Sequence, residues 1–318
     1  MRSAIRSGRE LYHRLGLEAQ WTSEFKSVEN DFPVFVPREF LAKIRPGDLD
    51  DPLLRQVLPI AEELVHSPGF SRDPVGDAAA QRATGLLKKY AGRALLVTTG
   101  ACAVHCRYCF RRHYPYAVST LNGRERAEVI RSLCGDDTIE EVLLSGGDPL
   151  TLSDPFLADL IDELSAIDHL RRLRIHTRVP IMIPSRITDS LVQMLSTGRL
   201  ATWFVIHVNH PRELDQATLA GLNRLVQAGV PVLNQSVLLR GVNDSAEVLV
   251  ELCRTLVNHR ITPYYLHQLD RVAGAAHFEV PTDEGQRLME QIRQVLPGYA
   301  VPRYVCEVAG RPYKEVIA

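Results

Sequence analysis

The stretch on which this chain is organised runs from Cys102 to Cys109 and reads CAVHCRYC. Its three cysteines have the spacing C-x₃-C-x₂-C, and no further cysteine lies near them in the sequence. A closed zinc site or an ordinary electron-transfer cluster takes four protein ligands. Three thiolates in one short loop therefore predict a [4Fe–4S] cluster in which one iron remains open to a small molecule.

Two other interpretations of this loop stay open from the residues alone. Free cysteines often pack as small apolar side chains. The neighbouring Arg107, Arg111 and Arg112 favour a polar loop over a core position. A zinc site that recruits His105 or His113 as its fourth ligand is the second alternative.

Outside this loop, the pattern of apolar residues in the sequence changes at about residue 93. Short apolar runs, as expected for buried parallel strands, lie at 94–99, 141–144, 173–176, 203–206, 232–237 and 264–266. Segments with helical periodicity alternate with them, at about 124–134, 153–166, 188–197, 214–228, 245–258 and 283–295. About six β-then-α units in series predict an α/β fold, a partial, open (β/α)₆ barrel, because a closed barrel of this type takes eight units.

The segments on either side of the barrel predict two smaller units. We expect residues 1–85 to form a mostly helical accessory region that covers the barrel mouth, with helices at about 11–17 and 53–65. The barrel itself is expected at 86–300, and a C-terminal segment at 301–318 follows it.

Polar side chains end most of the predicted strands. In α/β barrels the carboxyl ends of the strands line the active site. A buried glutamine inside a strand, such as Gln235, needs a partner, which is either structural or a ligand. The strand-end residues, which predict an active-site mouth on the side of the cysteines, are Ser145 to Asp148, His176, Arg178, His207, Asn209 and Asp270.

Composition limits the partners and the compartment. The chain has 318 residues, 45% hydrophobic and 24% charged, and its formal net charge of −1 gives no electrostatic footprint for nucleic acid or a membrane surface. No apolar run is long enough to span a bilayer, and no signal-peptide core follows Met1. A tight cysteine trio with three scattered cysteines is unlike a secreted disulfide framework. These features predict a cytoplasmic protein.

The motifs together resemble those of the lysine 2,3-aminomutases, radical S-adenosylmethionine (SAM) enzymes that also use pyridoxal 5′-phosphate (PLP). The similarity lies at 102–113, 145–150, 173–178, 234–239 and 263–267. Patterns at 51–57, 68–71 and 274–278 are similar to the shorter bacterial branch that supplies β-lysine for modification of elongation factor P. The resemblance implies a [4Fe–4S] cluster, SAM and PLP as cofactors, and conversion of L-lysine to (R)-β-lysine. It also implies a functional link to elongation factor P and its lysyl ligase.

The resemblance assigns three sets of residues to the cofactors. The residues that would bind the cluster are Cys102, Cys106 and Cys109. Those that would help hold SAM are Ser145, Gly147 and Gln235. Those that would bind PLP are the catalytic Lys314, through its amine, and Tyr90 and Arg93 at the phosphate.

Three further residues are assigned to the substrate by the same resemblance. Arg111 would bind the α-carboxylate, a task that suits a planar, bidentate guanidinium. Asp270 and Glu307 would receive the ε-ammonium group. The related aminomutases have Asp at the position of Glu307, so the acid here is longer by one methylene group.

Three alternative functions remain at this point. Another amino acid such as glutamate is a possible substrate, although Asp270 and Glu307 would repel a side-chain carboxylate. A radical SAM enzyme without PLP predicts that Lys314 is an ordinary solvated lysine. A non-enzymatic iron–sulfur or zinc module predicts no cleavage of SAM.

Overall fold

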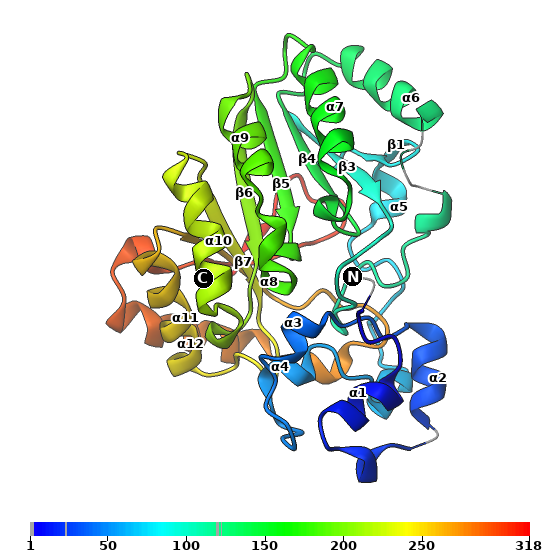
Figure 1. Cartoon of the computed structure of the whole chain (residues 1–318), viewed down its shortest axis with the longest axis vertical. Helices are drawn as coiled ribbons and strands as arrows, with labels where there is room; N and C mark the ends of the chain where they lie inside the picture. Colours follow the sequence, from blue (N-terminus) through cyan, green and yellow to red (C-terminus); the bar gives the residue numbers. More distant parts are fainter. Residues whose placement is uncertain (1–2, 23, 119–120, 122) are drawn as a thin grey trace.

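In a computed structural model, which describes residues 3–22, 24–118, 121 and 123–318, the described chain is built on one ten-stranded sheet (Figure 1). Its strands follow one another in sequence order. The six strands that the sequence predicts are parallel neighbours: β3 (Arg93–Thr99), β4 (Glu141–Gly146), β5 (Arg172–Thr177), β6 (Ala201–His207), β7 (Val232–Val237) and β8 (Thr262–His267). The expected barrel strands are therefore confirmed.

Further strands extend this sheet at both edges. The short β1 (Gln81–Ala83) and β2 (Leu86–Leu87) pair antiparallel, and β2 adds to the edge of β3. At the other edge, β9 (Arg303–Cys306) lies parallel to β8, and β10 (Glu315–Val316) returns antiparallel to β9. The last segment of the chain thus forms a hairpin at the rim of the barrel.

Helices alternate with the parallel strands as the periodicity predicts. They are α6 (Gly123–Cys134), α7 (Asp154–Ser165), α9 (Asp189–Thr197), α10 (Gln216–Gln227), α11 (Ala246–Asn258) and α12 (Thr282–Val295), and the short α8 (Val179–Met182) follows β5. Side-chain caps at Ser153, Thr188, Asp215 and Ser245 accept backbone N–H groups and start four of them. The alternation confirms the partial, open (β/α)₆ barrel.

The N-terminal region contains α1 (Gly8–Arg14), α2 (Glu24–Asp31), α3 (Arg38–Leu41), α4 (Pro52–Arg55) and α5 (Asp77–Ala80). The helix expected at 53–65 is wrong. α4 ends at Arg55, and a 3₁₀ turn at Ala61–Leu64 follows instead. Pro59 explains the break, because proline has no N–H to donate and disfavours helical geometry in the residue before it.

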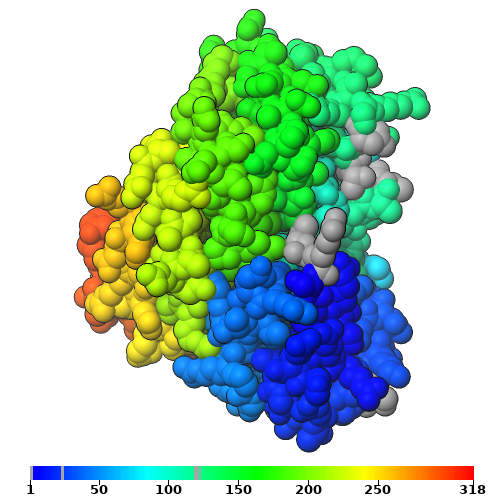
Figure 2. Space-filling model, in the orientation of Figure 1, coloured from blue at the N-terminus to red at the C-terminus, as the bar shows by residue number. Residues whose placement is uncertain are grey.

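The N-terminal region packs on the carboxyl ends of the central strands (Figures 1 and 2). The Lys43 ammonium donates to the backbone oxygens of Ile181 and Glu213, at 3.1 and 2.8 Å, in the loops after β5 and β6. Apolar side chains of this region, such as Phe40, belong to the same buried cluster as the strand residue Phe204. The region and the barrel therefore share one core. Among the described residues, no helix is both long and apolar enough to cross a membrane.

Candidate active site

The cysteine loop lies between β3 and α6, and the N-terminal region clamps it. Arg107, between two of the cysteines, is fully buried. Its Nε and Nη2 atoms donate to the two carboxylate oxygens of Glu63 at 2.8 and 2.6 Å, and Nη1 donates to the Phe32 oxygen at 2.8 Å. Arg112 Nη2 also donates to Glu63, at 2.8 Å. Glu63 thus joins two arginines of the loop to the N-terminal region through strong charge-assisted hydrogen bonds.

The three thiols lie close together, and neighbouring thiols influence the ionisation of Cys102 and Cys109. Burial, and then the neighbouring thiol of Cys106, raises the pKa of Cys109 to about 11. Burial and the thiol of Cys109 also raise the pKa of Cys102. Cys102 and Cys109 therefore need a bound cation to ionise at neutral pH, because metal ligation deprotonates a thiol. The donor set therefore fits an iron–sulfur cluster.

Each of the two histidines that a zinc site would recruit bonds to a backbone oxygen through one ring nitrogen. His105 Nδ1 lies 2.8 Å from the Pro33 oxygen, and His113 Nε2 lies 3.1 Å from the Ala273 oxygen. In the described part of the chain, no three His, Cys, Asp or Glu side chains surround a single ion position.

The glycine-rich turn after β4 packs against the start of the cysteine loop. Gly147 donates its N–H to the Thr99 oxygen and Asp148 to the Ala101 oxygen, both at 2.7 Å. A Cβ atom on Gly147 would lie 2.2 Å from the Ala101 oxygen, and Gly146 has a φ of +115°. Only glycines allow this close approach. The turn assigned to SAM and the loop assigned to the cluster are thus one packed unit.

The sheet register brings several predicted residues to one face. Ser145 pairs with Val97, and Gln235 pairs with both His207 and Tyr265. Paired residues of neighbouring parallel strands point to the same side of a sheet. The Gln235 side chain is half-buried, and no described residue makes a hydrogen bond with it. Its assignment to SAM stays a prediction.

Residues predicted for PLP and for the substrate meet in one chain of alternating charges. Arg111 Nε donates to Asp77 Oδ2 at 2.6 Å, and the Lys89 ammonium lies 2.7 Å from Asp77 Oδ1. Lys89 also pairs with Glu307 at 3.4 Å, and Glu307 pairs in turn with Lys314. The last two lie at the turn end of the β9–β10 hairpin, one step beyond the pair Cys306 and Glu315.

Burial and this chain of charges set the ionisation of the acids. Burial raises the pKa of Asp270 from its ordinary 3.8 to about 7; Lys314 opposes this effect and Glu307 adds to it. Burial also acts to raise the pKa of Asp77, but Arg111 and Lys89 outweigh it and hold that pKa below the ordinary value. The site therefore holds a firmly ionised acid at Asp77 and an acid at Asp270 that titrates near neutrality.

The residues predicted to bind the PLP phosphate lie beside this charge chain. The Arg93 guanidinium stacks on the Tyr90 ring at 4.6 Å, and Tyr90 is hydrogen-bonded to Glu307. Arg93 Nε and His176 Nε2 are buried, and neither has a hydrogen-bond partner among the described residues. The charges of Lys314 and Arg111 also reach His176. Unpartnered buried nitrogens among cations fit an anionic group such as a phosphate.

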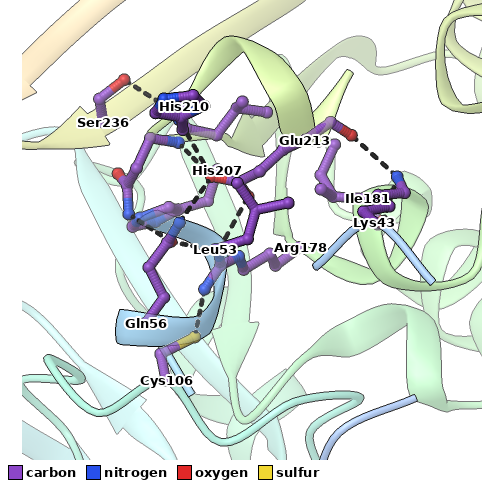
Figure 3. Close-up of polar contacts among 12 residues, drawn as sticks. Lys43, Leu53, Gln56, Cys106, Arg178, Ile181, His207, His210, Glu213 and Ser236 are labelled. Atoms are coloured by element: carbon purple, nitrogen blue, oxygen red, sulfur yellow. Dashed lines mark hydrogen bonds and ion pairs between the residues drawn. The ribbon is translucent and has the colours of Figure 1, made fainter. Parts of the chain in front are cut away.

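Behind the cysteine loop, the strand-end residues form a buried polar network (Figure 3). Arg178 Nη1 donates to Cys106 Sγ at 2.7 Å, and Nη2 donates to Gln56 and Glu213. Burial, together with the nearby Arg178 charge, lowers the pKa of His207 to about 3, so its ring is neutral. The prediction that polar strand ends gather beside the cysteines is confirmed for these residues.

Sequence reasoning missed the acids that hold the arginines of the site. Asp77 and Glu63 lie in the N-terminal region, where no strand-end rule applies, and Glu213 lies beyond the residues that end β6. Gln56 had a signal, because it lies inside the 51–57 pattern. No pattern in the sequence pointed to Lys89, apart from its position next to Tyr90.

Comparison with known proteins agrees with this geometry. A model of the Radical SAM superfamily matches residues 96–253, from β3 into α11. The fold is similar to a Streptococcus suis SuiB structure bound to S-adenosylmethionine, with a TM-score of 0.52, 16% identity, and coverage of 70% of this chain and 52% of that one. Radical SAM membership implies a [4Fe–4S] cluster and SAM as cofactors.

Curated relatives match almost the whole chain. An Escherichia coli K12 protein named L-lysine 2,3-aminomutase is 45% identical over 289 residues, which cover 91% of this chain and 84% of the relative. A Haemophilus influenzae protein of the same name is 41% identical over 318 residues, with coverage of 100% and 94%. On the strength of the cysteine loop, the barrel and these relatives, the chain belongs to the lysine 2,3-aminomutase family of radical SAM enzymes.

Proposed function

We propose that the protein converts L-lysine to (R)-β-lysine as a PLP-dependent radical SAM 2,3-aminomutase. The observation that carries this proposal is the charge chain from Arg111 through Asp77, Lys89 and Glu307 to Lys314. Lysine carries an α-carboxylate and an ε-ammonium group, so the guanidinium of Arg111 at one end of this chain and the carboxylate of Glu307 near the other match its two charged groups. The names of the relatives support the same substrate.

The residues present fit the three cofactors. The cysteine loop offers three thiols, the glycine turn offers a backbone surface, and Arg93 and His176 offer unpartnered buried nitrogens near the Lys314 amine. When bound, the cluster and SAM supply a hydrogen-abstracting radical, and PLP supplies a conjugated ring that spreads unpaired spin. The protein supplies binding and orientation.

Each polar residue of the site has a part in holding the substrate. Arg111 binds the α-carboxylate with the edge of its guanidinium that Asp77 leaves free. Glu307 and Asp270 bind the ε-ammonium group. An ammonium group that arrives beside Asp270 lowers its pKa from about 7, so the acid is ionised once lysine is bound. These contacts fix C2 and C3 of lysine in the position that the reaction requires.

The N-terminal region contributes the cover that excludes water. Its residues Lys43, Gln56, Glu63 and Asp77 bond to loops at the carboxyl ends of the strands. A dry, closed mouth protects a radical from quenching by solvent. Residues 1–85, the barrel at 86–300 and the segment at 301–318 then act as cover, catalytic scaffold and lysine-bearing hairpin.

We also propose that the β-lysine serves the modification of elongation factor P through its lysyl ligase in the cytoplasm. The patterns at 51–57, 68–71 and 274–278, which are similar to that branch of the family, support this link. None of the six cysteines is in a disulfide, which supports a reducing compartment.

The test is an anaerobic assay of the reconstituted protein with SAM, PLP, dithionite and L-lysine, with L-glutamate in parallel. Mass spectrometry after chiral derivatisation should detect (R)-β-lysine and no β-glutamate. Lys314→Ala and Cys106→Ala should each abolish the product, whereas Lys88→Ala, which removes an amine that pairs with Asp136 outside the site, should not. Deoxyadenosine without β-lysine would overturn the substrate, and an intact cluster with neither product would overturn the mechanism.

A further inference from the structure

The guanidinium of Arg178 contacts one of the three cysteines directly. Its Nη1 atom donates a hydrogen bond to Cys106 Sγ over 2.7 Å, and Figure 3 shows the two side chains pointing toward each other. Arg178 directly follows β5, as the residue before α8, and is buried. It belongs to the strand-end set and to the 173–178 motif, yet the proposed function gives its side chain no role.

Two acceptors on the far side hold this guanidinium in place. Nη2 donates to Gln56 Oε1 at 2.6 Å and to Glu213 Oε2 at 2.9 Å. Glu213 is fully buried, and its second oxygen accepts the N–H groups of Asn209 and His210, both at 3.0 Å. The carboxylate is therefore fixed, and it is the charged partner of Arg178 on the side away from the sulfur.

The backbone of Arg178 is also tied to the cysteine loop. Asp148 Oδ2 accepts the N–H groups of Arg178 and Val179 at 2.6 and 3.1 Å, and Oδ1 accepts the Thr177 hydroxyl at 2.7 Å. Because the N–H of Asp148 bonds to the Ala101 oxygen, one residue links the loop to the end of β5. The distance between the guanidinium and the sulfur is thus constrained from both sides.

We propose that Arg178 is a positioning residue that raises the reduction potential of the cluster by donating a charged hydrogen bond to the Cys106 sulfur, and that Glu213 partly offsets this effect. The inference rests on the proposed cluster site. Reduction adds one electron from an external donor to the cluster and makes or breaks no bond. A cation at a ligand sulfur favours the more negative, reduced form, since hydrogen bonds and charge near the sulfurs set the potential.

Arg178 and Glu213 should therefore shift the reduction potential of the cluster in opposite directions. Arg178→Gln removes the cation and should lower the midpoint potential. Glu213→Gln removes the anion behind it and should raise the potential, by less because the carboxylate is farther from the sulfur. A purely structural role would produce changes of the same sign in both variants, because both loosen the same network.

A matched control lies next to Glu213. The Arg212 guanidinium donates to Asp51 at 2.7 Å and to the Lys43 oxygen at 2.8 Å. It joins the N-terminal region to the barrel as Arg178 does, but it makes no bond to a cysteine among the described residues. Arg212→Gln should lower the melting temperature and leave the cluster potential unchanged.

The experiment is an anaerobic potentiometric measurement on the reconstituted proteins, with the electron paramagnetic resonance signal of the reduced cluster as readout. At the wild-type midpoint, we expect the ratio of reduced to oxidised cluster to fall about tenfold in Arg178→Gln, which is about 59 mV for one electron, and to rise about threefold in Glu213→Gln. Arg178→Lys keeps the positive charge but loses the planar guanidinium. The ratio of reduced to oxidised cluster should therefore fall less in this variant than in Arg178→Gln.

The outcomes separate this inference from the function on which it rests. Shifts of opposite sign, with iron content equal to wild type, support it. Equal potentials in all variants, or shifts of one sign in Arg178→Gln and Glu213→Gln, would overturn it and leave the aminomutase assignment intact. If Arg178→Gln does not retain iron, the other two variants still test the inference. It then predicts a lower midpoint potential in Arg178→Lys and a higher one in Glu213→Gln. A wild-type protein that never shows the reduced signal would overturn the cluster site and this inference together.

Discussion

The Nε atom of Arg111 lies 2.6 Å from Oδ2 of Asp77, and both side chains are buried. This hydrogen bond fixes the orientation of the Arg111 guanidinium, because Asp77 accepts from its Nε edge. Nη1 donates to the Ser145 hydroxyl at 3.3 Å, so the edge of the guanidinium that Asp77 does not use lies beside the glycine turn. An acid from the N-terminal region therefore orients a residue of the cysteine loop.

Replacement of Asp77 by Asn should disturb substrate binding more than catalysis. The variant leaves Arg111 and Lys89 without their shared counter-charge, so the guanidinium loses its fixed orientation. We expect the KM for L-lysine to rise about tenfold, which is about 1.4 kcal/mol of binding, with a smaller change in kcat. Steady-state kinetics check this, with the exposed Asp168→Asn as the control. An unchanged KM would show that Asp77 has no part in orienting Arg111.

Glu63 should be required for a stable cysteine loop. Glu63→Gln leaves the buried Arg107 and Arg112 without their carboxylate, and loss of one partner from a buried ion pair typically costs about 3–5 kcal/mol. Urea unfolding of the apoprotein should show this loss, and less iron should be retained after reconstitution. Its neighbour Glu62 is exposed, so Glu62→Gln should change the free energy of unfolding by less than about 0.5 kcal/mol. Equal stability of the two variants would contradict the clamp.

Asp270 should make the folded protein less stable as the pH rises, which is the opposite of the usual effect of a carboxyl group. Its pKa is about 7 when folded and near 3.8 when unfolded, so the folded state holds a proton there that the unfolded chain has lost. This contribution to stability is complete below about pH 4 and is lost as the pH rises through about 7. Lys314, Glu307, Lys89 and Asp77 are the charges that surround it.

Asp270→Asn should therefore gain stability over the wild type as the pH rises. We expect the difference in unfolding free energy between variant and wild type to increase by about 2 kcal/mol from pH 5 to pH 8 in the cofactor-free protein. Denaturant unfolding at both pH values measures it. The exposed Asp137→Asn should show no such trend, and a constant difference for Asp270→Asn would mean that its pKa is not raised.

Glu307 should tolerate the shorter acid of the related aminomutases. Glu307→Asp keeps a negative charge between Lys89 and Lys314, so kcat/KM for L-lysine should stay within about tenfold of wild type. Glu307→Gln removes that charge and should lower kcat/KM about a hundredfold, or about 2.7 kcal/mol. If Glu307→Asp loses as much activity as Glu307→Gln, the length of the side chain matters as much as its charge, and the expected tolerance of Asp is wrong.

The strands and the location of the site could be predicted from the sequence because both depend on local pattern. Buried runs such as 94–99 and 232–237 are short and apolar, and the polar residues that follow them, including Arg178 and His207, mark the carboxyl ends of strands. The pairing of Glu307 with Lys314 was not predicted, because it depends on the β9–β10 hairpin.

The partners of the site's arginines could not be predicted in the same way. Asp77 reaches Arg111, Glu63 reaches Arg107 and Gln56 reaches Arg178 only because the N-terminal region docks on the strand ends. That docking is a property of tertiary packing, and no periodicity encodes it. The break of the expected helix at Pro59 was visible in the sequence and was outweighed by the apolar periodicity around it.

The β9–β10 hairpin also has a consequence for the order in which the molecule folds. Lys89 and Glu307 are 218 residues apart in sequence, whereas Arg111 and Asp77 are separated by 34. Closing the longer loop costs more chain entropy, and contacts between distant segments form late. The half of the charge chain that carries Arg111 can therefore assemble first, and Lys314 joins it last. A barrel whose final hairpin has not yet docked will be compact and carry its cysteine loop, but it will lack the amine of Lys314, to which we assign PLP.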